Sequence, residues 1–375
     1  MIAGSDELNF LSSSLHIILG CRSRATAGTN RYPFRTEPNS SEGLYAGSVD
    51  VYRVANGVAK ESQPSELEAL LHRGDGFVWV DIPACDDVAT AVLSETFGFH
   101  PLAIKGCLER SHVPRIQAYP DYLYVVVHAP DAGEMGHVHL LELDQFIGLR
   151  YLITTHGPLG EGVALESALK ETRGVLERMK SGRFAPASPA DLSYAIVSGI
   201  ARRQESYVGR LATDIASLEK RVVAEAGQDP ELLLEEMFKL RHELLTIRTM
   251  AAQSREVYAR VSSLAAFLPD AAMPFVNDLA DQFDRVRSIC DGEKEFLQGV
   301  LDFYQSRVST KMNVAMERLT LIASVMLPIT AVAGIYGMNI IVNDRTNTLH
   351  VVVVLGFMSL IVLGMVRWAR KKGWW

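Results

Sequence analysis

The chain contains little cysteine, four residues among 375, and no CxxC spacing. These cysteines are scattered through the sequence as Cys21, Cys85, Cys107 and Cys290. Such spacing predicts neither a zinc site nor a disulfide framework, which is typical of a protein exposed to the reducing cytosol.

The sequence also lacks the motifs of an ATP-driven or catalytic protein. No GxxxxGK[ST] motif is present, which argues against an ATP-driven pump. No combination of nucleophile, base and phosphate-binding loop indicates an enzyme, and no organic cofactor is expected. The net charge of −7 gives no indication of nucleic-acid binding.

Charge is absent from residues 319–343, and a second apolar stretch follows after a short loop. About 20 apolar residues at a rise of 1.5 Å cover the hydrocarbon core of a bilayer. We therefore predict membrane helices at 319–339 and 349–368, joined by an external loop at 340–348 and followed by a basic tail at 369–375.

Basic residues flank these helices on one side of the membrane: Lys311 and Arg318 before the first, and Arg367, Arg370, Lys371 and Lys372 after the second. The connecting loop has only Arg345, beside Asp344. Basic flanks stay in the cytoplasm, so both termini are predicted to be cytoplasmic in a multi-pass protein of the cell (inner) membrane. The four basic residues after the second helix form a collar at the cytoplasmic mouth or anchor the helix at anionic headgroups.

Residues 1–47 are rich in Ser, Gly, Thr, Arg and Asn and predict a disordered leader. The segment Ile18-Leu19-Gly20-Cys21 loosely resembles a lipoprotein cleavage site. A secretory signal requires a basic start, but no Lys or Arg precedes this segment. Whether the leader belongs to the mature chain stays open.

Between leader and membrane the sequence changes character once. Residues 48–160 alternate β-rich runs with short helices and predict an α/β domain, with strands near 49–54, 77–82, 122–128, 137–147 and 151–155. Residues 161–268 predict antiparallel helices. A long stalk helix is expected at 269–318, continuing into the membrane because no proline interrupts 275–327.

The membrane segment TLIASVMLPITAVAGIYGMN, residues 320–339, resembles the first membrane helix of the CorA family of magnesium channels, which ends in Gly-Met-Asn. The basic end RKKGWW and the strand-forming stretches 114–128 and 141–157 are similar to the same family. The resemblance covers residues 49–375. It implies an α/β N-terminal cytoplasmic domain followed by long α-helices and a C-terminal two-helix transmembrane hairpin, assembled as a funnel-shaped homopentamer.

A hairpin of two helices cannot enclose an ion path alone, so a pore requires several copies; the resemblance implies five, with the first membrane helix lining the axis. Helical spacing places one stripe on the pore face: Asn313, Met316, Thr320, Leu327, Thr330 and Gly334. Ser324 lies at the same helical spacing. Small and hydroxyl residues also pack between membrane helices, and for Ser324 this packing role is at least as favoured as the pore.

By resemblance, Gly337, Met338 and Asn339 form the selectivity filter. Mg²⁺ dehydrates reluctantly, so a ring of neutral carbonyl oxygens can hold the hydrated ion without binding it too tightly for release. In isolation an Asn after a helix is more typical of a C-cap.

The loop after this motif departs from the Met-Pro-Glu-Leu of many relatives. Only Asp344 is available to attract cations at the external mouth, and Arg345 is its neighbour. The preference among Mg²⁺, Co²⁺, Ni²⁺ and Zn²⁺ therefore stays open.

Asp278 and Asp281 lie three residues apart on one face of the stalk helix. By its spacing from Gly-Met-Asn, Asp278 coincides with the regulatory metal site of the family. Repulsion between acidic faces, relieved when Mg²⁺ bridges two subunits, would close the channel at high internal Mg²⁺. An ordinary solvated helix face is the alternative, and the interface partner of Asp278 is not identified.

The sequence thus predicts a divalent cation channel that admits Mg²⁺, and with it Co²⁺ or Ni²⁺, under the membrane potential, with Mg²⁺ as both transported and regulatory ion. Its expected partners are further copies of itself and the lipid bilayer. The alternatives are a transporter of Zn²⁺ or another divalent metal with the same architecture, and a membrane-tethered sensor without transport.

Overall fold

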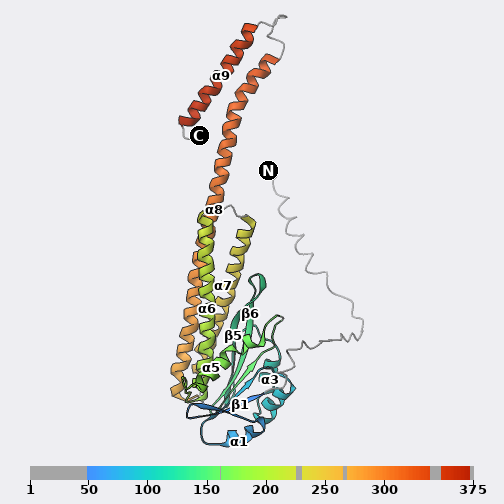
Figure 1. Ribbon diagram of the computed structural model, residues 1–375, viewed down its shortest axis with the longest axis vertical. Helices are drawn as coiled ribbons and strands as arrows, with labels where there is room; N and C mark the ends of the chain where they lie inside the picture. The colour runs from blue at the N-terminus through green and yellow to red at the C-terminus, as the bar shows by residue number, and fades with distance from the viewer. Residues whose placement is uncertain (1–48, 161, 225–229, 265–267, 338–347, 372–375) are drawn as a thin grey trace, which may run out of the picture. The chain divides into compact units, whose positions relative to one another are not determined.

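The structure is a computed structural model that describes residues 49–160, 162–224, 230–264, 268–337 and 348–371 (Figure 1). All of these residues belong to one compact unit, Tyr45–Trp375. The predicted leader, residues 1–47, lies outside the described residues.

One seven-stranded sheet organises the N-terminal part, in the order β2-β1-β3-β7-β6-β5-β4. Among the described strands, β3 and β7 form the only parallel pair. The strands are β1 Asp50–Ala55, β2 Val58–Ser62, β3 Phe77–Ile82, β4 Arg115–Ala118, β5 Tyr122–Ala132, β6 Val138–Gly148 and β7 Tyr151–His156. Asn56 and Gly57, both with positive φ, form the two-residue turn between β1 and β2, as tight hairpins require.

Helices cover both faces of this sheet because its inner strand β3 presents apolar side chains on both sides. All six residues of β3 are buried. Trp79 faces the cluster formed with α5 Lys170–Lys180, α6 Pro189–Ala224, α7 Pro230–Leu264 and α8 Met273–Gly337. Val78 and Val80 face the cluster formed with α1 Leu67–His72, α2 Asp87–Ala91 and α3 Pro101–Leu108. The remaining short helices are η2 Pro64–Glu66, η3 Val92–Thr96, η4 Glu134–Gly136, α4 Leu165–Ala168 and η5 Asp270–Ala272.

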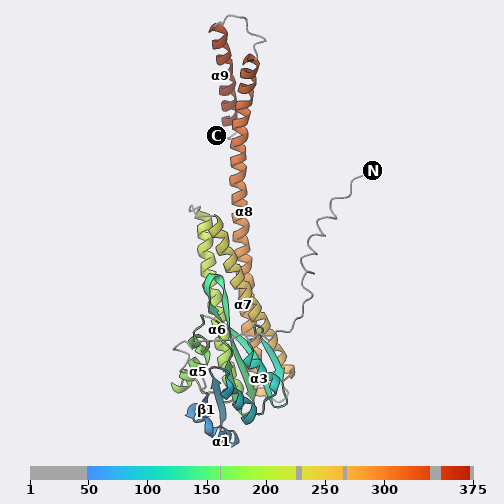
Figure 2. The ribbon, with the colours of Figure 1, turned by 90° about the vertical axis from the view of Figure 1, so that its right-hand side faces the viewer.

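Away from the sheet, α6, α7 and α8 pack into a three-helix bundle. Apolar residues at helical spacing meet in its core, among them Ile215 from α6, Leu244 from α7 and Val286 from α8. Figures 1 and 2 show α8 continuing past the ends of α6 and α7, with α9 Thr348–Lys371 running back beside it.

The predicted fold class, an α/β domain followed by long helices and two C-terminal apolar helices, is confirmed. The sequence interpretation missed the strands β2 and β4, and it did not anticipate that α8 completes the packing of the antiparallel α6–α7 pair. The pentamer stays a prediction, since the structure is that of a single chain.

The sequence interpretation did not single out two buried carboxyl groups on β6, Glu142 and Asp144. Glu142 Oε2 accepts a hydrogen bond from the backbone N–H of Ser111 at 2.6 Å, and Asp144 Oδ1 accepts one from the hydroxyl of Tyr124 at 3.1 Å. Burial raises the pKa of Glu142 to about 7, opposed by the nearby cations Arg115 and Arg110. Burial and the Glu142 charge also raise the pKa of Asp144.

The pKa of His128, the cross-strand neighbour of Glu142, is shifted in the opposite direction. His128 pairs with Glu142 in the β5–β6 register, and its Nε2 lies 2.8 Å from the Ser111 carbonyl oxygen. Burial lowers the pKa of His128 to about 4. Glu142 therefore contributes stability that is lost as pH rises from about 4.5 to about 7, whereas His128 costs stability as pH falls from about 6.5 to about 4.

We expect Glu142→Gln to gain stability relative to the wild type as pH rises from about 4.5 to about 7, by up to about 3 kcal/mol. The reason is that the variant no longer has to bury a carboxylate beside Asp144. Melting temperatures of the wild type and variant across this range measure the difference.

Glu205→Gln, at an exposed carboxylate on α6, is the matched control for the loss of one Glu charge and should not reproduce the gain of Glu142→Gln. His128→Gln should show the opposite pH trend to Glu142→Gln. A Glu142→Gln difference that does not change with pH would contradict the assignment of a raised pKa.

Candidate ion pathway and regulatory carboxylates

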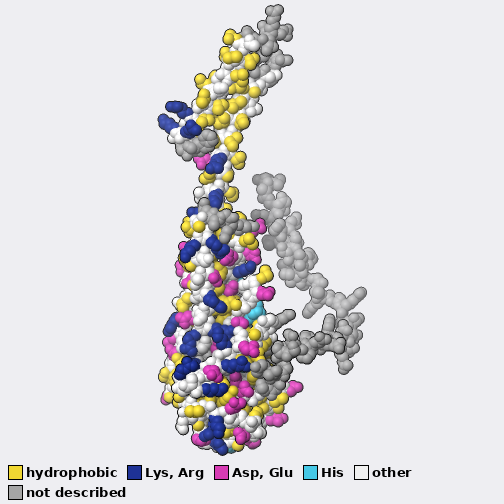
Figure 3. Space-filling model, viewed as in Figure 1, with side chains coloured by type: hydrophobic (Ala, Val, Ile, Leu, Met, Phe, Trp, Pro, Cys, Tyr) yellow, Lys and Arg dark blue, Asp and Glu magenta, His cyan; other side chains and the backbone are white. Residues whose placement is uncertain are grey.

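Two helices of the described residues, α8 and α9, are long and apolar enough to cross a membrane. None of their most apolar stretches is buried within the chain, unlike the core helix of a soluble domain. Figure 3 shows hydrophobic side chains covering this hairpin and Lys and Arg side chains gathered near its base. This pattern is expected for a helix pair in lipid with its ends at a charged surface.

The second helix covers only one face of α8. The half-buried residues of α8 in this region are Leu321, Val325, Pro328, Ile329 and Val332, which recur at helical spacing. Near the tip, an apolar groove lies between the helices, lined by Val332 and Ile335 from α8 and by Val353, Val354 and Phe357 from α9.

The predicted pore residues lie on the other side of α8. All six are exposed within the single chain: Asn313, Met316, Thr320, Leu327, Thr330 and Gly334. At 3.6 residues per turn they form a stripe roughly opposite the residues that α9 covers. The hydroxyls of Thr320 and Thr330 within the predicted membrane segment, and the amide of Asn313 before it, favour contact of this stripe with other subunits or with water.

The two threonines of this stripe present hydrogen-bond acceptors. The hydroxyl of Thr320 donates to the Met316 carbonyl at 2.8 Å, and that of Thr330 donates to the Met326 carbonyl at 2.9 Å. With their protons used inside the helix, the oxygen lone pairs remain available to a hydrated cation.

A further acceptor was missed by considering side chains alone. Pro328 lies inside α8 and has no N–H, so the carbonyl of Ser324, four residues earlier, lacks its helical donor. Sequence reasoning weighed only the hydroxyl of Ser324; the presence of Pro328 was the signal that could have revealed this backbone group.

The structure places only part of the predicted filter and mouth. Gly337 is the last residue of α8, whereas Met338, Asn339 and Asp344 lie outside the described residues. In the predicted basic collar, Arg367, Arg370 and Lys371 are exposed on the last turns of α9. Lys372 also lies outside the described part of the chain.

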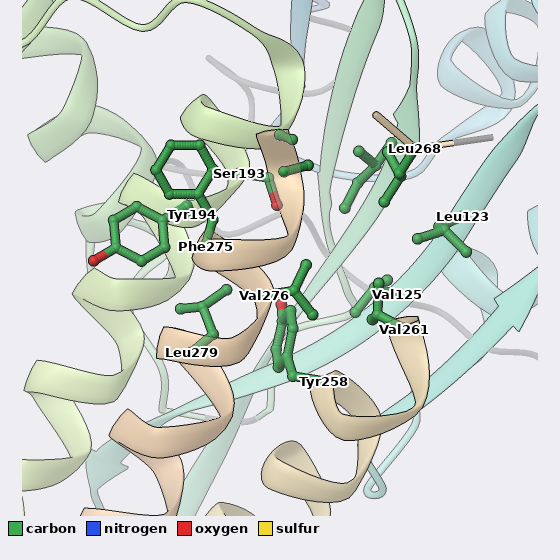
Figure 4. A pocket seen from close by; sticks show the side chains of 13 residues that line it. Leu123, Val125, Ser193, Tyr194, Tyr258, Val261, Leu268, Phe275, Val276 and Leu279 are labelled. Atoms are coloured by element: carbon green, nitrogen blue, oxygen red, sulfur yellow. The ribbon is translucent and has the colours of Figure 1, made fainter. Parts of the chain in front are cut away.

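At the other end of α8, packing against the sheet fixes the position of the predicted regulatory carboxylates. Figure 4 shows the side chains that meet there: Phe275, Val276 and Leu279 of α8, Tyr258 and Val261 of α7, and Leu123 and Val125 of β5. Asp278 lies on the outer side of the same turns, where its Oδ2 accepts hydrogen bonds from the hydroxyl of Tyr194 at 2.7 Å and from Gln282 at 2.5 Å.

Two of the acidic residues of α8, Asp284 and Asp291, form ion pairs with arginines. Asp284 lies 3.0 Å from both Arg255 and Arg287, and Asp291 pairs with Arg248 and Arg287. The hydrogen bond from Arg248 lowers the pKa of Asp291.

Asp278 and Asp281 are exposed and have no ion pair among the described residues. Within the described part of one chain, no group of three or more His, Cys, Asp or Glu side chains could hold a metal ion. A cation at Asp278 and Asp281 would therefore need ligands from water or from another subunit.

Residues 74–371 match the family model described as CorA-like Mg²⁺ transporter protein. The chain belongs to this family. It is 28% identical to the putative metal ion transporter YfjQ of Bacillus subtilis, over 79% of this chain and 89% of that one. It is 23% identical to the cobalt/magnesium transport protein CorA of Thermotoga maritima, over 84% and 89% of the two chains.

The complete structure of the CorA magnesium transporter from Methanocaldococcus jannaschii shares the fold, with a TM-score of 0.73, at 20% identity over 87% of this chain and 98% of that one. A more distant relative is the zinc transport protein ZntB of Yersinia enterocolitica, 22% identical over 53% of this chain and 60% of that one. Members of the CorA family are transporters and not enzymes, so this chain is a CorA-family divalent cation transporter.

The two faces of α8 give a testable difference in accessibility. Leu327→Cys, on the predicted pore stripe, should react with a cationic methanethiosulfonate reagent and lose most of its ion flux, because the stripe would line a wetted path. Val325→Cys is the matched control, since that position is half-buried on the side covered by α9. The ion flux before and after the reagent, compared with that of the unsubstituted protein, measures the effect. Block of the Val325→Cys variant without block of the Leu327→Cys variant would contradict the assignment of the pore to the stripe and place it on the opposite face of α8.

Proposed function

We propose that this protein is a Mg²⁺ channel of the cell (inner) membrane, with both termini in the cytoplasm and membrane segments at 319–339 and 349–368. The observation that carries the proposal is the exposed stripe from Asn313 to Gly334 on α8, opposite the face that α9 covers. Co²⁺ and Ni²⁺ are further candidate ions, as the name of the Thermotoga relative includes cobalt.

The pore would form between copies of the chain. One hairpin has two membrane helices and cannot surround water, so the polar stripe needs neighbours on both sides. We propose five copies, the number that the resemblance implies, with α8 lining the axis and α9 facing lipid.

We assign ion selection to a ring of Gly337, Met338 and Asn339 at the outer end of α8. Neutral carbonyl oxygens can contact the water shell of Mg²⁺ without removing it, which allows both entry and release. The membrane potential supplies the driving force, about 2.3 kcal/mol per charge per 100 mV and twice that for a divalent ion.

Zinc transport is the second candidate. The relatives include a zinc transport protein, and the loop after Asn339 offers a single carboxylate, Asp344, with Arg345 beside it. A mouth with little negative charge concentrates cations weakly.

Asn339→Ala should reduce Mg²⁺ influx at least tenfold, because it removes a carbonyl acceptor from every subunit of the ring. The measurement is influx into proteoliposomes with an inside-negative potential, repeated with Co²⁺, Ni²⁺ and Zn²⁺. Ser359→Ala on α9, whose hydroxyl donates to the Leu355 carbonyl at 2.8 Å, is the control and should leave influx unchanged.

The pattern of transported ions decides between the candidates. Influx of Zn²⁺ without Mg²⁺ would replace the magnesium assignment with the zinc one. Absence of influx of all four ions from folded protein at low internal Mg²⁺ would leave a membrane-tethered sensor.

We also assign regulation to Asp278 and Asp281. Unpaired carboxylates on neighbouring subunits repel one another, and Mg²⁺ bound between them would favour the closed arrangement. Asp284 and Asp291 are less suited, because arginines already neutralise them.

Replacing both carboxylates, Asp278→Asn with Asp281→Asn, should raise the internal Mg²⁺ concentration that halves the influx by at least fivefold. Asp302→Asn is the control, an exposed carboxylate on the same helix that accepts a hydrogen bond from Gln298 at 3.0 Å. An unchanged inhibition curve in the double variant would assign these residues to an ordinary solvated helix face.

A further inference from the structure

Two histidines lie one residue apart where the β5–β6 hairpin turns back, His137 just before β6 and His139 within it. Their imidazole rings are in contact, with centroids 4.9 Å apart and planes at 85° to each other. Residues two apart on an extended chain point to the same face of a sheet, which explains why the rings meet. His137 is exposed and His139 is half-buried, so solvent reaches the pair.

Packing on the helical bundle fixes this part of the hairpin. Val138, between the two histidines, is buried in the core cluster of α6, α7 and α8. The turn η4 contacts α7 (Figure 1). Gly136 in this turn lies so close to Lys239 that a Cβ at position 136 would come within 2.9 Å of the Lys239 Cβ. The backbone that carries the two imidazoles is therefore held in place without any ligand.

A glycine in the turn leaves room for the second ring. Gly133 donates its backbone N–H to the His137 carbonyl at 2.8 Å, and a Cβ at position 133 would lie 2.8 Å from Nε2 of His139. No hydrogen bond or ion pair engages either imidazole within the described part of the chain. The ring nitrogens are therefore available to a ligand from solution.

The separation of the rings suits two imidazoles on one metal ion. With metal–nitrogen bonds of about 2.1 Å, two imidazoles bound at a tetrahedral angle have their centroids roughly 5 Å apart. The observed centroid distance is 4.9 Å. Rotation about χ2, which is broad for histidine, is enough to direct one nitrogen of each ring to a shared ion.

We propose that His137 and His139 form a transition-metal site in the α/β domain, with water completing the coordination of an ion such as Zn²⁺. Two protein ligands agree with the absence of a cluster of three or more ligand side chains in the described part of the chain. Asp131 is opposite His139 in the β5–β6 register, but Arg203 pairs with its carboxylate at 3.0 Å, so we do not count it as a ligand. A site with several water ligands exchanges its ion with solution.

The ligand atoms determine which cations this site selects. Imidazole nitrogen suits Zn²⁺, Cu²⁺ and Ni²⁺, whereas Mg²⁺ prefers oxygen ligands such as the carboxylates of Asp278 and Asp281. The histidine pair would therefore bind transition metals in the presence of Mg²⁺. This binding does not rest on the proposed function, since it requires neither a pore nor a second copy of the chain.

The test is Zn²⁺ binding to the full-length protein in detergent, measured by isothermal titration calorimetry at mildly alkaline pH, where free imidazole is neutral. Excess Mg²⁺ in the buffer occupies oxygen sites. We expect a Zn²⁺ site that Mg²⁺ does not displace, at least tenfold weaker in His137→Gln or His139→Gln and lost in the double variant. His242→Gln, at an exposed histidine on α7, is the matched control and should leave the affinity unchanged.

Pulsed EPR with Cu²⁺ in place of Zn²⁺ identifies the ligands, and should detect two coordinated imidazoles in the wild type and one in His137→Gln. Because His137 is exposed, its replacement should leave the fold intact, which the melting temperature of the metal-free variant checks. Unchanged Zn²⁺ affinity in folded His137→Gln would reduce the pair to a ring contact and overturn the proposal. An equal loss of affinity in His242→Gln, or displacement of Zn²⁺ by Mg²⁺, would also overturn it.

Discussion

Hydrocarbon cannot satisfy backbone polar groups or solvate an ion, and this constraint determines what α8 and α9 can do. Away from their ends, the two helices satisfy their own N–H and C=O groups, apart from the carbonyl that Pro328 leaves without a helical donor. Within one chain, α9 covers one face of α8 and leaves the stripe with Asn313, Thr320 and Thr330 uncovered. A pore lined by the proposed stripe would therefore depend on contacts between chains.

The same helix also provides the connection between sheet and membrane. Its first turns pack on the sheet through Val276, Leu279 and Phe283, its middle joins the three-helix bundle through Val286 and Val300, and its last part is apolar and exposed. Because these segments are one uninterrupted helix, a displacement of the carboxylate-bearing turns is carried along the axis toward the membrane segment. A two-state change of this helix is the simplest way in which a cytoplasmic ion could control the proposed pore.

The sequence predicted those features that depend on local patterns. Apolar length identified both membrane helices, alternating β-rich runs identified five of the strands, and the segment ending in Gly337-Met338-Asn339 identified the family. Contacts between distant residues were not predictable in this way. Glu142 and Asp144 look like polar positions of an ordinary strand until their burial is seen. Asp284 and Asp291 pair with arginines of α7, whereas within the described residues Asp278 does not. This difference between the carboxylates depends on the packing of α7 on α8.

The number of copies sets how strong a regulatory site needs to be. Moving a two-state equilibrium from 1:99 to 99:1 requires about 5.5 kcal/mol of differential binding. If five equivalent sites act on one concerted change, each needs to favour the closed state by only about 1 kcal/mol, roughly a sixfold difference in affinity. Asp278 and Asp281 suit a weak site of this kind. Both side chains are exposed, and Asp278 accepts hydrogen bonds from Tyr194 and Gln282. A tight, fully enclosed metal site on each chain would be unnecessary for such a switch, and its slow ion release would oppose reopening when internal Mg²⁺ falls.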